Sequence, residues 1–424
     1  MSDLISKDQQ HVWHPFTQHH TAGDPLPIVK AEGVYLYDES GKSYIDANAS
    51  WWVNTHGHGH PHIGKALSEQ FQTVDHIVFA GATHPKAVEL AERICGHLPD
   101  HFQKVFFSDN GSTAVEIALK MAIQYWHNKG ENKQRFLAMH GSYHGDTFGA
   151  MSVGQRGYFN APFEPLFFDT DYLDFPNGSN ESEILERAES LLSSGDFAGL
   201  IVEPLVQGAA GMRMYAPEFL DQLTAIAQKH GVLVIFDEVM TGFGKTGKLF
   251  SMDHCQNKPD FVALSKGLTA GVMALGLTVT SDKIYEAFLG EETTKALLHG
   301  HSFTANPIAC SVACANLDLF EREETWQNID AMVQWNQAFA EELTQFDFVV
   351  NIRQQGTILA FEIQESGEAS YFSDLKTRAY EFFLERGVLL RPLGNVIFVN
   401  PPFCITEEEF GKVKEVILSF LKSL

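Results

Sequence analysis

A buried strand, a helix and a second buried strand follow one another between residues 199 and 237, and this order constrains the fold more than any other feature. The runs 199–202 (Gly-Leu-Ile-Val) and 232–236 (Val-Leu-Val-Ile-Phe) are apolar throughout and predict buried strands. Residues 217–230 begin with proline and are followed by Gly231, as expected of a helix with marked ends. Strands joined through a helix are parallel, so the sequence predicts an α/β fold with a mainly parallel, doubly wound sheet.

Polar and aromatic residues stand where several of the predicted strands end. In a doubly wound sheet, ligands bind outside the carboxyl ends of the strands. The residues expected at that edge are 108–112, Tyr143, Glu203, Asp237 and Lys266. Any one of them could stand there by chance, but together they predict a ligand-binding site at this edge of the sheet.

Lys266 and Asp237 indicate the kind of chemistry. The apolar run 261–264 leads directly into Ser265-Lys266-Gly267, and the run 232–236 ends in Asp237-Glu238. A lysine amine can form an imine with a carbonyl cofactor, and a carboxylate can keep a ring nitrogen protonated. Taken alone, Lys266 would more often be an ordinary surface lysine, so the prediction depends on the residues around it.

Residues 104–113 predict a short strand followed by the first turn of a helix. The strand stops at Asp109-Asn110-Gly111, and Thr113 and Glu116 have the spacing of a capping box. Free backbone amides and the helix dipole make such a helix start, with its glycine and hydroxyl side chains, a candidate anion site. An ordinary turn between a strand and a helix has the same pattern, so this stretch does not decide the matter by itself.

Two other motifs could indicate a metal site and a nucleotide-binding loop, and both of these interpretations are disfavoured. Histidines alternate with small residues at His56, His58, His60 and His62, but no carboxylate or thiolate stands at a zinc-site spacing from them. A turn with polar caps is therefore favoured over a metal site. Gly244-Lys245-Thr246 matches the end of a nucleotide-binding phosphate loop, but Val239 stands where the first glycine of that loop should be.

The composition narrows the partners and the compartment. The chain of 424 residues has a formal net charge of −24, which disfavours nucleic acid and anionic membranes as partners. The sequence contains no apolar run of membrane-spanning length and starts with polar residues, so a cytoplasmic protein is expected. The five cysteines are scattered, which favours structural thiols in a reducing compartment. Further helices are predicted from about Pro61 to Val74 and over residues 309–320.

The chain resembles the class III aminotransferases, enzymes of fold type I that use pyridoxal 5′-phosphate. Four stretches carry this resemblance, which extends nearly end to end: 110–112 (Asn-Gly-Ser), 237–244 (Asp-Glu-Val-Met-Thr-Gly-Phe-Gly), 265–267 (Ser-Lys-Gly) and 300–303 (Gly-His-Ser-Phe). The resemblance implies a large cofactor-binding domain over residues 56–315. It also implies a smaller α+β domain over residues 316–424, joined by the N-terminal segment 1–55.

The resemblance also implies roles around the cofactor. Lys266 would bind it covalently and then move a proton, Asp237 would pair with its ring nitrogen, and Tyr143 would stack on the ring, which makes these three the expected catalytic residues. The expected cofactor contacts are Gly111, Ser112, Tyr143, Glu203, Asp237, Lys266, His301 and Ser302. His301 and Ser302 would come from the second subunit of a homodimer that shares its active sites.

Other motifs resemble one branch of this family, which aminates 8-amino-7-oxononanoate during biotin synthesis. They are residues 13–17, 50–52, 143–152, 206–212 and 391–392. The substrate contacts implied by the resemblance are Phe16, Trp51, Trp52, Tyr143, Asp146, Lys245, Lys266, Gly300 and Arg391. Arg391 would hold the carboxylate of the keto acid, because a guanidinium matches a carboxylate with two hydrogen bonds.

Departures from the pattern of that branch leave the amino donor open. Phe16 stands where tyrosine is frequent, Lys245 where arginine is frequent, and Ser302 where threonine is common. S-adenosylmethionine is the favoured donor. Lysine is the alternative, because Phe16 and the Gly300-His301-Ser302 run partly resemble a subgroup that uses it. Another ω-amino acid aminotransferase, a non-catalytic protein on the same fold and a histidine-rich metal protein are the less favoured readings.

Overall fold

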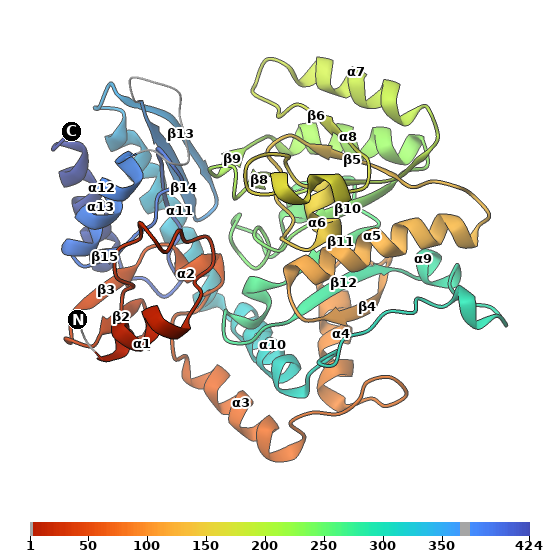
Figure 1. Cartoon of the computed structure of the whole chain (residues 1–424), viewed down its shortest axis with the longest axis horizontal. Coiled ribbons are helices and arrows are strands. Elements are labelled where there is room, and N and C mark those ends of the chain that lie inside the picture. Colours follow the sequence, from red (N-terminus) through yellow and green to blue (C-terminus); the bar gives the residue numbers. More distant parts are fainter. Residues whose placement is uncertain (1–2, 365–373) are drawn as a thin grey trace.

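A seven-stranded sheet forms the centre of the larger lobe in the computed structural model, which describes residues 3–364 and 374–424 (Figure 1). In spatial order its strands are β4 (Phe102–Ser108), β12 (Gly276–Ser281), β11 (Phe261–Leu264), β10 (Leu233–Asp237), β7 (Phe197–Val202), β5 (Arg135–Met139) and β6 (Thr170–Leu173). From β11 to β6 all neighbours are parallel, whereas β12 is antiparallel to both of its neighbours. The prediction of a mainly parallel α/β sheet is confirmed.

Both faces of this sheet are buried, which explains why its strands read as continuous apolar runs. In β10, Leu233 and Ile235 pack into the core on one face, while Val234 and Phe236 pack into the core on the other. Successive side chains of a strand point to opposite faces, so both sets of positions must be apolar when helices cover both sides. The strand ends are then the places where polar side chains can be accommodated.

Helices cover this sheet, and the predicted ones are confirmed. The helices of the large lobe are α3 (Pro61–Thr73), α4 (Pro85–His97), α5 (Gly111–Asn128), α6 (Phe148–Val153), α7 (Glu181–Leu192), α8 (Pro217–Lys229), α9 (Asp282–Glu286) and α10 (Pro307–Phe320). Short 3₁₀ turns are η1 (Ala161–Leu166), η2 (Ser251–His254), η3 (Lys266–Thr269) and η4 (Thr293–Lys295). As predicted, α8 starts at a proline and is followed by Gly231, which has the left-handed φ of 65°. No helix in the described ranges is long and apolar enough to cross a bilayer.

The two ends of the chain meet in the second lobe (Figure 1). Its strands are β1 (Ile28–Glu32), β2 (Tyr35–Asp38), β3 (Ser43–Asp46), β13 (Val349–Gln355), β14 (Ile358–Ile363), β15 (Val388–Leu389) and β16 (Val396–Val399). Its helices are α1 (Asp3–His11), α2 (Ala49–Trp52), α11 (Glu323–Leu343), α12 (Asp374–Glu385) and α13 (Glu407–Leu421). A separate two-stranded hairpin is formed by β8 (Val206–Gln207) and β9 (Arg213–Met214). Strands β3 and β15 pair directly, so the N-terminal segment and the C-terminal part share one sheet. Domain boundaries near residues 55 and 315 stay a prediction.

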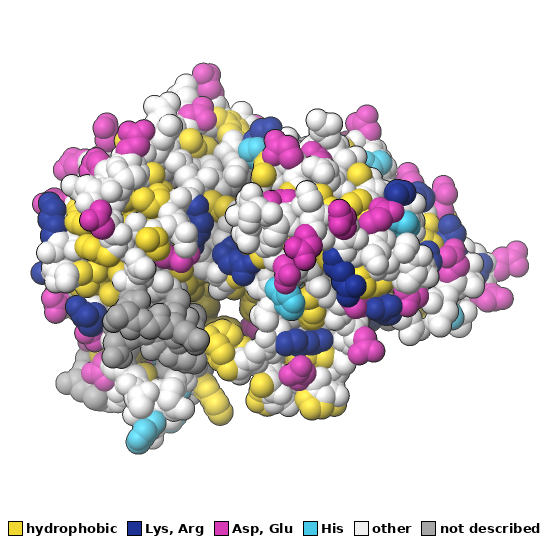
Figure 2. Space-filling view, turned by 90° about the horizontal axis from the view of Figure 1, so that it is seen from above, with side chains coloured by type: hydrophobic (Ala, Val, Ile, Leu, Met, Phe, Trp, Pro, Cys, Tyr) yellow, Lys and Arg dark blue, Asp and Glu magenta, His cyan; other side chains and the backbone are white. Residues whose placement is uncertain are grey.

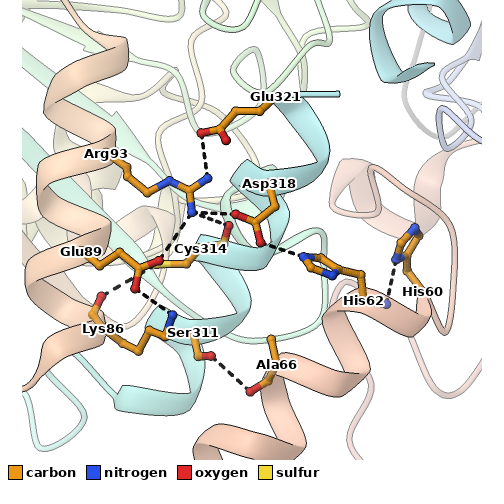
Figure 3. A network of polar contacts seen from close by, with 10 residues as sticks. All are labelled: His60, His62, Ala66, Lys86, Glu89, Arg93, Ser311, Cys314, Asp318 and Glu321. Atoms are coloured by element: carbon orange, nitrogen blue, oxygen red, sulfur yellow. Dashed lines mark hydrogen bonds and ion pairs between the residues drawn. The ribbon is translucent and has the colours of Figure 1, made fainter. Parts of the chain in front are cut away.

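A charged network joins three helices of the large lobe (Figure 3). Arg93 of α4 lies 2.8 Å from both Asp318 and Glu321 and donates to the carbonyl of Cys314 at 3.0 Å. His62 of α3 lies 2.7 Å from Asp318, so the same carboxylate holds two helices against α10. On the face in Figure 2, acidic side chains spread over both lobes with basic ones between them, in keeping with the net charge of −24.

Candidate active site

Lys266 is the first residue of η3, two residues after the end of β11, and its backbone is strained. Its φ is 48°, a left-handed value that costs a non-glycine residue free energy. The turn is held by Asn316 of α10, whose Nδ2 donates to the carbonyls of Gly267 at 2.9 Å and Leu268 at 3.1 Å. A side chain at Gly267 would lie 2.9 Å from Cβ of Phe243, so glycine is needed there. The tight packing explains how the strained conformation is maintained.

The side chain of Lys266 is half-buried and lies beside aromatic and acidic groups. Its Nζ is 4.9 Å from the ring centroid of Trp52. Burial lowers the pKa of Lys266, and the nearby carboxylates of Asp237 and Glu203 oppose this effect. A lowered pKa increases the fraction of free amine, which is the nucleophilic form.

Asp237 ends β10, and His144 fixes its carboxylate. Oδ2 of Asp237 lies 2.7 Å from Nδ1 of His144, and Oδ1 accepts from the amide of Val239 at 3.1 Å. Both side chains are buried, Asp237 being 4% exposed and His144 3%. The sequence prediction did not include His144 among the site residues. Its position between Tyr143 and Gly145 after a predicted strand was the only signal that could have indicated it.

Glu203, which follows β7, fixes the turn that carries Tyr143. Oε1 accepts from the amide of Tyr143 at 3.0 Å, and Oε2 accepts from the amide of Gly208 at 3.0 Å. Burial raises the pKa of Glu203 to about 7, while His144 and the two amides act in the opposite direction. The hydroxyl of Tyr143 donates to Asp146 at 2.9 Å, and burial raises the pKa of Tyr143 well above its ordinary range. Tyr143, Asp146 and Glu203 are thus brought together as one unit.

The start of α5 has the features of an anion site. Asn110 caps the helix by accepting from the amide of Thr113 at 3.0 Å. The amides of Gly111 and Ser112 have no protein acceptor within the described ranges, so they are available to a ligand. A side chain at Gly111 would approach Cγ1 of Val239 to 2.6 Å, and one at Gly145 would collide with Ser112. Glycine at these two positions keeps this end of the site open.

The predicted capping box of Thr113 and Glu116 is wrong. The capping box is formed one turn earlier, by Asn110 and Thr113, because Asn110 is the residue with extended backbone before the helix. Glu116 is instead directed toward α6, where its Oε1 accepts from the amides of Gly149 at 2.6 Å and Ala150 at 3.2 Å.

The loop 299–302 lies beside Asp109, one residue before Asn110. His301 lies 3.2 Å from Asp109 through Nδ1 and 2.9 Å from Nε2 of His299 through Nε2. Gly300 and Ser302 are exposed. Whether this loop serves the site of a second subunit, as the resemblance implies, stays a prediction.

Trp51 and Trp52 lie in a strained turn between the second lobe and the site. Ser50 and Trp52 have φ values of 60° and 63°, and Asp46 stabilises the turn by accepting from the amide of Ser50 at 2.8 Å and from its hydroxyl at 2.9 Å. Trp52 is buried, whereas Trp51 is 47% exposed. The guanidinium carbon of Arg391 lies 5.9 Å from the ring centroid of Trp51. Trp52 therefore lies beside the amine of Lys266, and the neighbouring Trp51 lies beside the guanidinium of Arg391.

Phe16 and Lys245 lie in different environments. The ring of Phe16 is 53% exposed and lies 5.6 Å from that of Trp51, so it belongs to the same outer surface. Lys245 is 1% exposed, and its Nζ donates to Oδ1 of Asn400 at 3.2 Å. Burial lowers the pKa of Lys245 to about 7. The structure thus places Lys245 in the interior, and its contact with substrate stays a prediction.

Three of the four alternating histidines make separate polar contacts. His58 lies 3.0 Å from Asp46, and His62 pairs with Asp318. His60 is the N-cap of α3 and accepts from the amide of His62, which confirms the predicted polar cap. No group of three or more side chains suited to a metal occurs among the residues that the structure describes.

Comparison with known proteins identifies the family. The model of the family "Aminotransferase class-III" matches residues 17–421. The chain belongs to the class III aminotransferases. It is 44% identical to the adenosylmethionine-8-amino-7-oxononanoate aminotransferase of Synechococcus elongatus, over 98% of this chain and 99% of the relative. The enzyme of the same name from Geobacter sulfurreducens is 40% identical, over 95% of this chain and 93% of its own length.

Solved structures agree with this family. The adenosylmethionine-8-amino-7-oxononanoate aminotransferase of Methanocaldococcus jannaschii superimposes with a TM-score of 0.93 at 35% identity, covering 98% of each chain. An amine transaminase from an uncultivated Pseudomonas species, solved in its pyridoxal-phosphate-bound form, gives a TM-score of 0.89 at 29% identity, covering 97% of this chain and 98% of the other. The predictions of the family, the fold type and a transaminating enzyme that uses pyridoxal phosphate are confirmed.

The residues of this class III aminotransferase fit that cofactor. The two free amides at the start of α5 and the open space kept by Gly111 and Gly145 suit a phosphate group. Asp237, held by His144, suits a protonated ring nitrogen, and the amine of Lys266 suits a carbonyl carbon. The phosphate, the ring nitrogen and the carbonyl carbon of the cofactor would therefore each have a matching group at this edge of the sheet.

Proposed function

We propose that this aminotransferase transfers an amino group to 8-amino-7-oxononanoate and forms 7,8-diaminononanoate, a step of biotin synthesis. Relatives named for that activity are 35% to 44% identical over nearly the whole chain. The observation that carries the proposal is the arrangement of Lys266, the two indoles and Arg391. It suits a substrate with a carbonyl at one end, a carboxylate at the other and an apolar chain between them.

The residues around the cofactor divide the chemical work. When bound, pyridoxal phosphate supplies an electrophilic carbonyl for the amino group and a ring that accepts the electron pair left at the α-carbon. Nζ of Lys266, with its lowered pKa, accepts the proton from the α-carbon of the donor. When the amino group passes to the acceptor, the same amine returns a proton to the acceptor carbon that receives it. Asp237 places a negative charge beside the ring nitrogen, and His144 keeps that carboxylate in position.

The outer residues bind and orient the substrate. Arg391 holds the carboxylate, and Trp51 covers the apolar chain and separates it from water. Tyr143 would stack on the cofactor ring, and the bonds from its amide to Glu203 and from its hydroxyl to Asp146 would hold it in position. Orientation of this kind accelerates the transfer because the reacting groups are held close together before the reaction.

S-adenosylmethionine is the proposed donor, and lysine is the alternative. The names of the relatives favour S-adenosylmethionine, whereas Phe16 lacks a hydroxyl at the outer surface. A cytoplasmic homodimer, in which Gly300, His301 and Ser302 contribute to the site of the other subunit, is part of the same proposal. Another ω-amino acid aminotransferase remains the second candidate, because solved ω-transaminases superimpose over the whole chain at 27% identity.

Single-turnover spectroscopy of the holoenzyme tests the proposal. S-adenosylmethionine should remove the visible absorbance of the lysine-bound cofactor, and 8-amino-7-oxononanoate should restore it. Lysine in place of S-adenosylmethionine distinguishes the two donors. Lys266→Ala is the control and should lack the band in the first place. If β-alanine or ornithine removes the absorbance and neither proposed donor does, the biotin-pathway assignment is wrong.

A further inference from the structure

Three aromatic rings form a row on the outer surface next to Arg391. The ring of Phe16 lies 5.6 Å from that of Trp51 on one side and 6.0 Å from that of Phe159 on the other. Tyr158 packs against Phe159 at 4.1 Å. About half of each of the rings of Phe16, Trp51 and Phe159 is exposed, at 53%, 47% and 52%. The row therefore presents three half-exposed apolar rings at the surface.

The segment that carries Phe159 is firmly attached to the turn that carries Tyr143. Gln155 donates from its amide to the carbonyl of Ser142 at 2.8 Å, and its Oε1 accepts from the amide of Gly141 at 2.6 Å. Asn160, only 7% exposed, accepts from the amide of Gly157 at 3.0 Å and donates to the carbonyl of Gln155 at 2.8 Å. An exposed ring on a segment held by these four bonds has a defined position relative to the cofactor site.

We infer that Phe159 is a specificity-determining residue that, with Phe16 and Trp51, forms the side wall for the apolar chain of the keto-acid substrate. Arg391 lies at the Trp51 end of the row, where it binds the carboxylate. The chain that joins the carboxylate to the carbonyl passes the rings, and its contact with Phe159 removes apolar surface from water. The inference rests on the proposed function and adds a residue that selects for chain length.

An aromatic wall of this kind acts on binding of the acceptor and not on the chemical step. Phe159 lies outside the Lys266 and Asp237 cluster, so its removal leaves the reacting groups in place. The contact is the same in the ground state and the transition state, so its loss raises KM and leaves kcat nearly unchanged. S-adenosylmethionine, the proposed donor, does not carry the same long apolar chain, so its KM is not affected.

The test compares Phe159→Ala, Phe159→Leu and the control Phe163→Ala in the holoenzyme. Phe163 is also an exposed ring, at 43%, but it packs on Phe148 and is not part of the row. Phe159→Ala should raise KM for 8-amino-7-oxononanoate by roughly tenfold, as expected for the loss of one partly covered phenyl ring. Phe159→Leu should recover most of this loss, and Phe163→Ala should behave like the wild type.

The outcomes separate this inference from the proposed function. If the wild type does not use 8-amino-7-oxononanoate, the proposed function fails. If the wild type uses it and Phe159→Ala has an unchanged KM for it, the inference is wrong. An equal loss for donor and acceptor, accompanied by a lower melting temperature that Phe159→Leu does not restore, would assign Phe159 a structural role and would also overturn the inference.

Discussion

Replacing Lys245 with methionine should stabilise the protein at pH 7, and this advantage should shrink as the pH rises. Lys245 is 1% exposed, and the one hydrogen bond of its amine goes to Oδ1 of Asn400, among the residues that the structure describes. Burial lowers the pKa of this lysine from 10.5 to about 7. Methionine has a similar length and carries no charge, so it removes the cost of burying an ammonium group without leaving a large cavity.

The magnitude follows from the two pKa values. Between pH 7 and pH 10.5 the unfolded chain keeps the proton of Lys245 and the folded chain does not, so folding releases a proton and the free energy of unfolding rises with pH. At about 1.36 kcal/mol per pH unit, the cost of Lys245 at pH 7 is roughly 5 kcal/mol. The variant leaves Oδ1 of Asn400 without a donor, which costs about 1–3 kcal/mol. Lys245→Met should therefore be about 2–4 kcal/mol more stable than the wild type at pH 7.

Urea denaturation of both proteins at pH 7 and pH 9 measures this effect. The difference in the free energy of unfolding should narrow by about 2 to 3 kcal/mol between the two pH values, because other titrating groups are common to both proteins. Lys65→Met is the matched control, since the side chain of Lys65 is 72% exposed, and it should show no pH-dependent difference. A difference between wild type and Lys245→Met that is constant from pH 7 to pH 9 would refute the reasoning.

Three further predictions concern other parts of the molecule. Arg391→Ala should raise KM for the keto acid by about 10- to 100-fold with little effect on the donor half-reaction, measured by single turnover; equal effects would remove its assigned role. Arg93→Met, which breaks the pairs with Asp318 and Glu321, should lower the free energy of unfolding by about 1–3 kcal/mol in urea, and an unchanged value would show that the network in Figure 3 adds no stability. Burial and Lys120 lower the pKa of His299, so the bond that its Nδ1 accepts from Nζ of Lys120 at 2.8 Å is present above the ordinary pKa of 6.5 and is lost as the pH falls through the lowered value; hydrogen exchange over residues 297–303 should accelerate there, and a rate independent of this transition would contradict the prediction.

The positions at which the strands end could be predicted from the sequence, because they depend on the parallel sheet, which is the most regular part of the fold. The runs that became β7 and β10 are buried on both faces, so their apolar character stops where the sheet stops. Glu203, Asp237 and Lys266 follow directly, and the parallel order brings them to the same edge. This part of the site needed only the pattern of the strands and the rule for ligands in doubly wound sheets.

The directions of side chains in the connecting turns could not be predicted in this way. Asp237 and Glu238 are adjacent acids in the sequence, yet only Asp237 faces the cofactor site. Glu238 accepts from the amides of Ser251 at 2.8 Å and Met252 at 2.7 Å and fixes a distant turn. Lys245 likewise stands in a motif but is directed into the core. These directions depend on the backbone angles of irregular turns, which no periodic pattern encodes.

Because the backbone of Lys266 is strained, the position of this lysine depends on α10, a helix far along the chain. Lys266 and Trp52 both have left-handed φ values, 48° and 63°, and neither residue adopts them without external support. Asn316 supplies that support for the turn after Lys266 through two hydrogen bonds, and it lies on α10, which the Arg93 network holds against α4. The position of the reactive amine therefore depends on packing between helices that contribute no group to the chemistry. This dependence accounts for the fully buried Asn316 in α10, where leucine would pack equally well but would leave two carbonyls without a donor.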